Sequence, residues 1–241
     1  MCSVADTVSK SAGGTFESNI SVGGTLSVTG NVISPITLAG TTPTLTIGDA
    51  GAEDAKIVFD GNAQDYHIGL DDSADTLVIG KGSALGTTTA MSIDANGIIT
   101  KPLQPAFSVK KSSTQTNIAL NGYVNIDFET EIFDQNGDFA SNTFTAPVTG
   151  RYLLNTVIYC TSLDLDSRYY QLNLTTSNRT YYDVISPPPH DSDIEFHCFS
   201  CTVLADMDAN DTATVVFNLP SDGAAQMDIQ SDSHFSGYLV A

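Results

Sequence analysis

The uneven distribution of glycine and aromatic residues constrains the fold of this chain more than any other feature. Fourteen of the 19 glycines lie in residues 1–101, whereas 17 of the 20 phenylalanines and tyrosines follow residue 101. A glycine-rich, aromatic-poor segment cannot fill a thick monomeric core, but each aromatic ring can bury a large apolar area. The sequence therefore predicts a thin fibrous region first and a globular domain second, joined by an extended connector at Pro102 and Pro105.

Residues 13–51 alternate apolar with small polar residues in short runs punctuated by glycine and proline, which is typical of short β-segments. A thin monomer cannot bury one apolar face per short strand, but three chains packed around an axis can, and they also hide the sheet edges. We therefore expect a trimeric β stalk over residues 13–101, preceded by an anchoring tail at residues 1–12. The short runs are residues 19–22, 25–28, 36–38 and 44–47.

Residues 52–101 predict a small β unit of strands and turns, with Asp60-Gly61 and Asn96-Gly97 suited to hairpin turns. This stretch carries the phrases I-V-F-D-G from residue 57, Y-H-I-G-L-D-D from residue 66 and T-L-V-I-G from residue 76. In these phrases it resembles tail-fibre and appendage proteins of tailed bacteriophages. The resemblance implies a virion protein that is assembled in the cytoplasm of a host bacterium.

The remainder of the chain predicts about ten strands, several with a clear alternation of apolar and polar residues. In one strand Tyr152, Leu154, Thr156 and Ile158 share a face. Ten strands at this spacing, separated by turn residues, indicate a β-sandwich. The expected strands are residues 107–109, 123–128, 143–146, 150–160, 169–175, 180–185, 194–204, 212–219, 227–230 and 235–241.

A spaced motif within residues 103–241 resembles the C1q/TNF-like jelly-roll family. It runs Phe-x5-Gly-x-Tyr-x-Leu from residue 144, and Phe-Ser-Gly-Tyr-Leu from residue 235 matches the last strand of the family. The leucine at 154 departs from the aromatic residue usual there. The resemblance implies an all-β homotrimeric head with an apolar axis. It places in the core or at the trimer axis Phe144, Gly150, Tyr152, Leu154, Phe235, Gly237 and Tyr238.

The charge of the chain argues against two classes of partner. The formal net charge is −19, and the nine lysines and arginines are scattered singly apart from Lys110-Lys111. Nucleic acids require clustered cations, and an anionic membrane surface would repel this chain. The sequence also holds no apolar stretch long enough to insert into a membrane and no leader pattern at Met1.

Three groups of residues are candidates for metal binding or catalysis. Cys198 and Cys201 have metal-ligand spacing, but residues three apart on a strand face opposite ways, so buried apolar cysteines are the better hypothesis. Carboxylates are plentiful, but no nucleophile elbow or zinc-protease motif is present, and we expect no enzyme and no firmly bound cofactor. Calcium remains an alternative to a simple turn at Asp208, Asn210 and Asp211.

A loop of tyrosines and prolines is the best candidate for a contact surface. Aromatic rings beside a rigid proline run would lower the ordering cost of binding. The other interpretation is a long loop that simply caps the sandwich. The candidate receptor-binding residues are Tyr181, Tyr182, Asp183, Pro188, His190 and Asp191.

These observations together predict a trimeric virion fibre of a tailed phage. The head would bind a glycan or protein of the host surface, and the N-terminus would attach to another virion protein of the tail or capsid. A capsid decoration or head-fibre protein with a mainly structural role is the alternative, and the length of 241 residues favours it. The attachment partner, the host and the receptor are left open.

Overall fold

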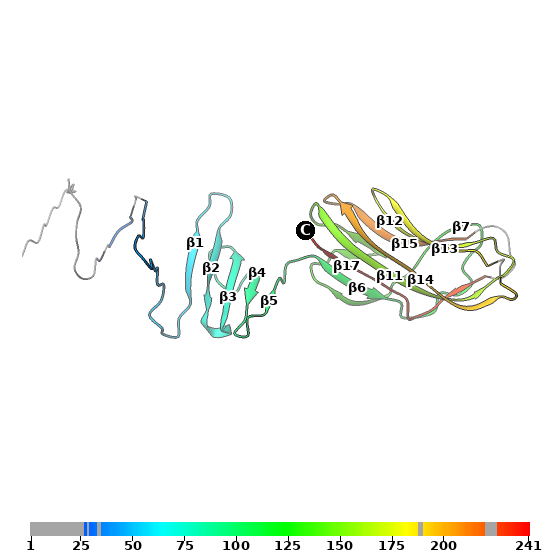
Figure 1. Ribbon diagram of the computed structural model, residues 1–241, viewed down its shortest axis with the longest axis horizontal. Helices are drawn as coiled ribbons and strands as arrows, with labels where there is room; N and C mark the ends of the chain where they lie inside the picture. The colour runs from blue at the N-terminus through cyan, green and yellow to red at the C-terminus, as the bar shows by residue number, and fades with distance from the viewer. Residues whose placement is uncertain (1–26, 28, 33–34, 188–189, 220–225) are drawn as a thin grey trace, which may run out of the picture. The chain divides into compact units, whose positions relative to one another are not determined.

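The chain forms a small five-stranded sheet and a larger β-sandwich, as the computed structural model in Figure 1 shows. The structure describes residues 27, 29–32, 35–187, 190–219 and 226–241. Within these ranges the single helix is a short 3₁₀ turn, η1 (Asp72–Ala74), capped by the side chain of Asp71. No helix in the described part of the chain is long and apolar enough to cross a bilayer.

The described residues before residue 55 form no strand. The β-segments predicted at 36–38 and 44–47 are therefore wrong for the single chain, whose side chains there are exposed. Ile36 is 72% exposed and Leu45 is 66% exposed. An extended segment without a neighbour has no partner for its main-chain hydrogen bonds. Three other predicted segments lie outside the described residues. They are the tail 1–12, the β-segment 19–22 and, apart from Ser27, the β-segment 25–28.

The small sheet is an antiparallel meander in the order β1-β2-β3-β4-β5. The strands predicted between residues 52 and 101 are confirmed, and short turns join them. A β-bulge shifts the register of β3 and β4 between Ile79 and Gly80. The strands are β1 (Ala55–Phe59), β2 (Tyr66–Asp71), β3 (Thr76–Lys81), β4 (Thr89–Ile93) and β5 (Ile99–Thr100).

One face of the small sheet is apolar and uncovered in the single chain. Directly paired residues point to the same side of a sheet, so the register gathers apolar side chains from β1 to β4 in one row. This row contains Ile57, Ile68, Ile79 and Met91. Leu70 and Leu77 pair with each other in the next row of the same face and are 44% and 41% exposed.

The opposite face of the small sheet carries glycines and polar residues together with two valines, Val58 and the buried Val78. His67 is buried there beside Gly80, and its Nδ1 lies 2.8 Å from the carbonyl oxygen of Gly82. A Cβ on Gly80 would lie 2.5 Å from the His67 ring, so this position requires glycine. The small sheet therefore has one face on which His67, Val78 and Gly80 are closely packed and one apolar face that the described residues leave exposed.

The sandwich is all β, with its twelve strands in the described residues arranged in two antiparallel sheets. Alternating residues from both sheets point inward and form one core, which is how a sandwich buries two faces at once. The strands are β6 (Ala106–Lys110), β7 (Gly122–Asn125), β8 (Thr130–Asp134), β9 (Phe139–Ala140), β10 (Thr143–Thr145), β11 (Gly150–Leu163), β12 (Tyr170–Thr176), β13 (Thr180–Ile185), β14 (Ile194–Met207), β15 (Thr212–Leu219), β16 (Asp228–Ile229) and β17 (His234–Leu239).

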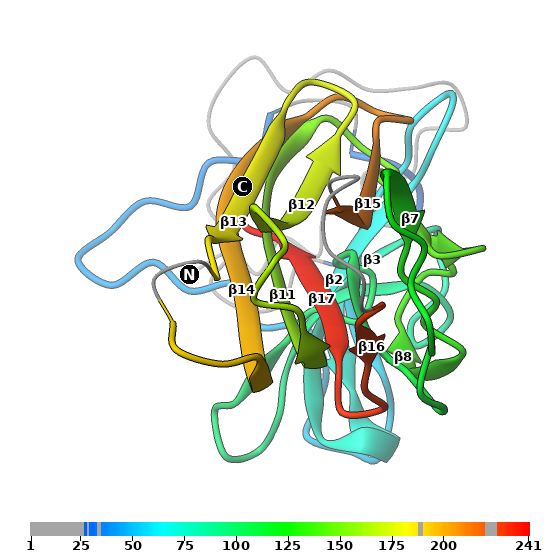
Figure 2. The same ribbon diagram turned by 90° about the vertical axis from the view of Figure 1, so that its right-hand side faces the viewer.

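The two sheets are called the front sheet and the back sheet. The front sheet runs β14-β11-β17-β6-β8, with β16 also paired to β11, and the back sheet runs β13-β12-β15-β10-β9, with β7 also paired to β15. Figure 2 shows β14, β11 and β17 side by side in one layer and β13, β12, β15 and β7 in the other. The first and last strands of the sandwich, β6 and β17, are neighbours, as expected of a jelly roll.

A cluster of phenylalanines fills one part of the core. Phe107 of β6 stacks on Phe139 and Phe144 at centroid distances of 5.2 and 4.7 Å and meets the edge of Phe235 at 5.0 Å. Such stacked and edge-on contacts add to the energy of apolar burial. The predicted concentration of aromatic residues after residue 101 therefore does build the core of the sandwich.

A buried lysine is the main departure from the expected apolar interior. Lys111 has a side chain that is 0% exposed, and its Nζ donates to the Asp127 carbonyl oxygen at 2.8 Å and lies 3.6 Å from Oε1 of Glu129. The predicted strand 123–128 ends early, at Asn125, and the next residues wrap around this ammonium group. A buried cation requires such partners, which sequence alternation alone does not reveal.

Candidate functional site

Four residues of the C1q-like motif lie in the interior of the sandwich. Phe144, Tyr152, Leu154 and Phe235 are each at most 1% exposed. The Tyr152 hydroxyl donates to the carbonyl oxygen of Val148 at 2.8 Å, and burial raises the pKa of Tyr152, so it stays a neutral donor. These side chains hold the core rather than forming a surface for a ligand.

The two glycines of the motif allow close packing. A Cβ on Gly237 would lie 2.6 Å from Cδ2 of Leu154, and one on Gly150 would lie 2.8 Å from the carbonyl oxygen of Ala241. Neither position has space for a larger residue without movement of its neighbours. The structural interpretation of both glycines is therefore supported by their surroundings.

Tyr238 differs from the rest of the motif because it lies on the outer face of the front sheet and is 48% exposed. It pairs with Leu153 of β11, which pairs with Leu204 of β14, and Leu204 is 56% exposed. A groove of about 440 Å³ runs beside Leu153 and Tyr238 to Phe133. This face carries large apolar side chains that the single chain leaves uncovered.

Sequence reasoning missed Leu153, Leu204 and Phe133 as surface residues. The signal was present in β11, where the core residues alternate with Leu153, Asn155, Val157 and Tyr159 on the other face. That second set is unusually apolar for a strand exposed to water. An apolar outer set beside an apolar inner set indicates that both faces of the strand need a partner.

The structure separates the tyrosines of the candidate receptor-binding loop. Tyr181 and Tyr182 lie within β13, not in a loop, so their side chains point to opposite sides of the back sheet. Tyr181 packs against the core, while Tyr182 is 64% exposed on the outer face. The two tyrosines therefore cannot contact one ligand from the same face of the sheet.

The other candidates of this set also have separate places. Oδ2 of Asp183 accepts the main-chain N–H of Ser200 at 3.0 Å and so links β13 to β14. His190 and Asp191 are exposed between the two strands, and Pro188 lies outside the described residues. The structure does not bring the five described candidates together as one surface.

The cysteine spacing gives no paired metal ligands. Cys201 is buried and Cys198 is exposed, as expected for residues three apart on β14. The expectation that both are buried is wrong for Cys198, because the intervening residues place it on the outer face. Burial also raises the pKa of Cys160 and of Cys201, which makes both poor nucleophiles.

The candidate calcium ligands lie in the turn between β14 and β15. Oδ2 of Asp211 accepts the main-chain N–H of Asp208 at 2.8 Å and the side-chain amide of Asn178 at 3.0 Å. Asn210 adopts a left-handed backbone with φ of 74°, which asparagine tolerates. In the described part of the chain no three His, Cys, Asp or Glu residues are arranged to hold a metal. Calcium at this turn stays a prediction.

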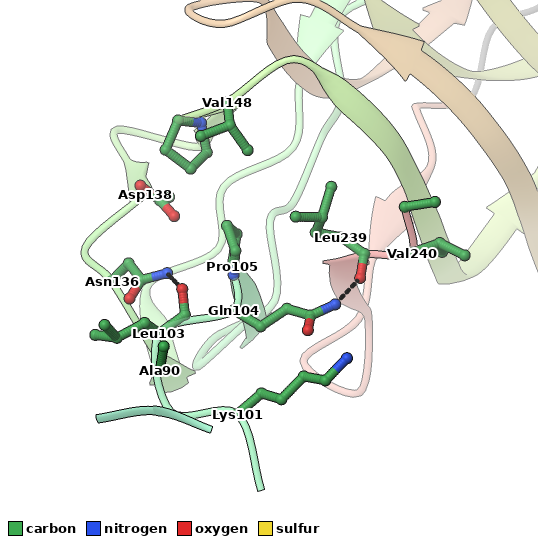
Figure 3. A pocket seen from close by; sticks show the side chains of 12 residues that line it. Ala90, Lys101, Leu103, Gln104, Pro105, Asn136, Asp138, Val148, Leu239 and Val240 are labelled. Carbon is green, nitrogen blue, oxygen red and sulfur yellow. Dashed lines mark hydrogen bonds between the residues drawn. The ribbon is translucent and has the colours of Figure 1, made fainter. Parts of the chain in front are cut away.

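A pocket of about 700 Å³ lies where the chain enters and leaves the sandwich (Figure 3). The side-chain amide of Gln104 donates to the carbonyl oxygen of Leu239 at 2.6 Å, and that of Asn136 donates to the carbonyl oxygen of Leu103 at 3.2 Å. Asp138 also lines the pocket. Burial is the larger cause that raises the pKa of its carboxyl group, and the negative charge of nearby Asp134 raises it further. These contacts fix the ends of the domain to each other.

Comparison with known proteins supports the fold. The C1q domain family matches residues 106–240, and domains of this kind are typically non-enzymatic. No curated protein matches the chain. Among solved structures, the globular domain of zebrafish complement 1qA is 18% identical, with 57% of this chain and 98% of that one covered and a TM-score of 0.45. Murine APRIL is 8% identical, with 57% and 99% covered and a TM-score of 0.42.

The sandwich thus has the strand order of a jelly roll, the spaced aromatic and glycine positions in its interior and a family match over nearly its whole length. Through residues 106–240 this chain belongs to the C1q domain family.

Proposed function

We propose that this chain is the subunit of a homotrimeric virion fibre of a tailed bacteriophage, whose C1q-like head recognises the surface of the host cell. The observation that carries the proposal is the uncovered apolar face of the small sheet. The stalk would be the region 13–101, the N-terminus would attach to another virion protein, and the head would present its surface to the host.

The small sheet supports a trimer because one layer cannot bury its own apolar face. Ile57, Leu70 and Ile79 are each at least 40% exposed in the single chain. Three copies around a common axis would bury these residues in a shared interior, and each square ångström of apolar surface removed from water contributes about 25 cal/mol. Contiguous apolar faces of this kind mark contact surfaces in soluble proteins.

The head has a second apolar face that is exposed in the single chain. Leu153, Leu204 and Tyr238 form a row on the outside of the front sheet, and Phe133 lies beside them. Burial of this row against neighbouring copies would give the head a trimer contact of its own. C1q and TNF domains often form trimers, which agrees with this arrangement.

The phage role is supported by the phrases between residues 57 and 80 that resemble appendage proteins of tailed phages. A fibre with three identical heads also suits adhesion, because several weak contacts made together give strong overall attachment. The acidic surface keeps an exposed, repetitive β protein soluble.

Light scattering on the purified full chain tests the trimer. The expected mass is three times the chain mass of 25.4 kDa. The fluorescently labelled trimer is then incubated with candidate host bacteria, which it should bind. A stable monomer would contradict the assembly, and a trimer that no susceptible host strain retains would contradict the recognition role.

Quantitative mass spectrometry of virions, measured against the major capsid protein, tests the position on the particle. A few trimers per virion are expected of a fibre. A copy number that matches the capsid lattice would instead assign the chain to capsid decoration.

A further inference from the structure

A groove of about 580 Å³ crosses the outer face of the back sheet, on the side of the head away from the front sheet. Four adjacent strands build it, in the order β13, β12, β15, β7 seen in Figure 2. The register aligns one residue from each strand across its floor. This row is Tyr182, Asn173, Val216 and Asn125.

Two exposed tyrosines stand on the outermost strands of the groove. Tyr123 of β7 is 72% exposed and Tyr182 of β13 is 64% exposed. Four strands cover three inter-strand spacings, so the Cα atoms of the two tyrosines lie about 14 Å apart or more. The face of an aromatic ring is electron-rich and packs well against weakly positive C–H groups. The pair therefore suits a ligand that is longer than one sugar ring and exposes C–H faces along its length.

The floor between the tyrosines presents neutral hydrogen-bonding groups in fixed positions. The Gln171 amide donates to Oδ1 of Asn173 at 2.6 Å, and the hydroxyls of Thr175 and Thr180 are 3.4 Å apart. Asn173 is only 3% exposed, so its orientation is set by its surroundings. Amides and hydroxyls offer both donors and acceptors, which is the requirement for binding sugar hydroxyls. Because these groups are already ordered, a ligand would bind at low entropic cost.

The same lining disfavours other classes of ligand. No Asp, Glu, Lys, Arg or His lines the groove, and the net charge of the chain is −19. Sulfated sugars and nucleic acids would meet no cation there. Val216 is the one aliphatic side chain among the lining residues, whereas a protein partner generally requires an apolar centre.

We infer that this groove binds a neutral oligosaccharide, with Tyr123 and Tyr182 stacking on sugar rings and Asn125, Gln171 and Thr175 hydrogen-bonding to hydroxyls. The inference deepens the proposed function, on which it rests for its biological use, by naming the receptor class and the site.

A glycan array tests the ligand class. The fluorescently labelled full-length protein is applied to neutral gluco-, manno- and galacto-oligosaccharides and to sulfated and sialylated ones. The expected result is binding to neutral oligosaccharides of two or more sugars. No bound neutral glycan, or binding restricted to the sulfated and sialylated set, would overturn the inference.

Variants then locate the site, with titration of the best neutral oligosaccharide from the array as the measurement. Tyr182→Ala and Tyr123→Ala should each weaken binding about tenfold, since buried aromatic contacts dominate recognition sites. Tyr182→Phe keeps the ring and should stay within about threefold of the wild type. Val184→Ala, on the same face of β13 but outside the lining, serves as the matched control and should bind normally.

Because Tyr123 and Tyr182 are largely exposed, their removal should leave the core intact. Light scattering and thermal unfolding of each variant are the control for this. Equal binding by the alanine variants and the wild type would overturn the assignment of the groove. Whole-cell binding separates the two proposals. If Tyr182→Ala still binds host cells as well as the wild type, the groove inference fails while the recognition role stands. If neither protein binds any susceptible strain, the recognition role fails, and the array and titration alone decide about the groove.

Discussion

Gly237 lies on β17 with the side chain of Leu154 on one side and Phe107 on the other. A Cβ at this position would lie 2.6 Å from Cδ2 of Leu154 and 2.9 Å from Cε1 of Phe107. Both neighbours are fully buried, so neither can move freely. Overpacking of a dense core costs about 1–3 kcal/mol, and we expect Gly237→Ala to lower the free energy of unfolding by this amount.

Urea unfolding measures this change, and Gly122→Ala is the matched control. A Cβ on Gly122 of β7 would meet no atom within 4 Å. That variant should stay within about 0.5 kcal/mol of the wild type. Equal stability of the two variants would contradict the close packing described for Gly237.

Glu129 gives the head a component of acid sensitivity. Its carboxylate accepts the N–H of Ser112 at 2.8 Å and lies near the ammonium group of Lys111. Burial raises the pKa of Glu129, but the hydrogen bond from Ser112 and the charge of Lys111 together lower it by more, to below 4.5. A lowered pKa in the folded state means that the stabilisation is present above pH 4.5 and is lost as the pH falls through the folded value.

The urea midpoint, followed from about pH 6 to about pH 3, checks this sign against the variant Glu129→Gln. The wild type should be more stable at the higher pH, and its advantage over the variant should shrink on acidification. An advantage that does not change with pH would show that the Glu129 charge does not contribute.

At the scale of strands, alternation in the sequence predicted most of the sandwich and much of the small sheet. The run around Leu172 has one apolar and one polar set, and it forms a strand with the apolar set inside. The runs at 36–38 and 44–47 alternate as well, but the single chain provides no neighbour to pair with. A local pattern shows whether a segment favours the strand conformation, and the presence of a partner strand decides whether the strand forms.

The candidate site was harder to predict than the strands, for a related reason. Tyr182 was identified from its type, but Tyr123 and Asn173 come from distant parts of the chain and meet only through the pairing of β7, β15 and β12. In β12, Gln171, Asn173 and Thr175 alternate with the apolar residues and form its polar outer face. The register between strands that turns this face into a groove is a tertiary property, which no local pattern contains.

The small sheet allows a matched test of the assembly, because adjacent residues of β1 point to opposite faces. Ile57 belongs to the apolar row and Val58 to the other face, and they are 40% and 36% exposed. Ile57→Lys should convert the trimer to monomers, since it would place a charge in an apolar interface. Val58→Lys adds the same charge and should leave the trimer intact, as light scattering would show. A trimeric Ile57→Lys variant would exclude this face as the interface.

For the whole molecule, charge would set how the proposed trimer approaches a cell. Each chain carries a net charge of −19, and three chains would triple the charge that an anionic bacterial surface repels. Raising the ionic strength from 0.01 to 0.15 M shortens the Debye length from about 30 to about 8 Å. We therefore expect the association rate with host cells to rise over this range, while the dissociation rate, set by the neutral groove, changes little. A rate that falls with added salt would indicate a cationic contact instead.

The position of β6 determines how the head would carry mechanical load. The chain enters the sandwich through Pro105, whose carbonyl oxygen accepts the N–H of Leu239, and it continues directly into β6 between β17 and β8. The hydrogen bonds on both sides of β6 run across the strand. A pull along β6 therefore acts on all of them in shear at the same time, and no outermost bond can open first. When drag on a particle stretches its tether to a cell, a strand held on both sides resists extraction better than one that peels from an edge.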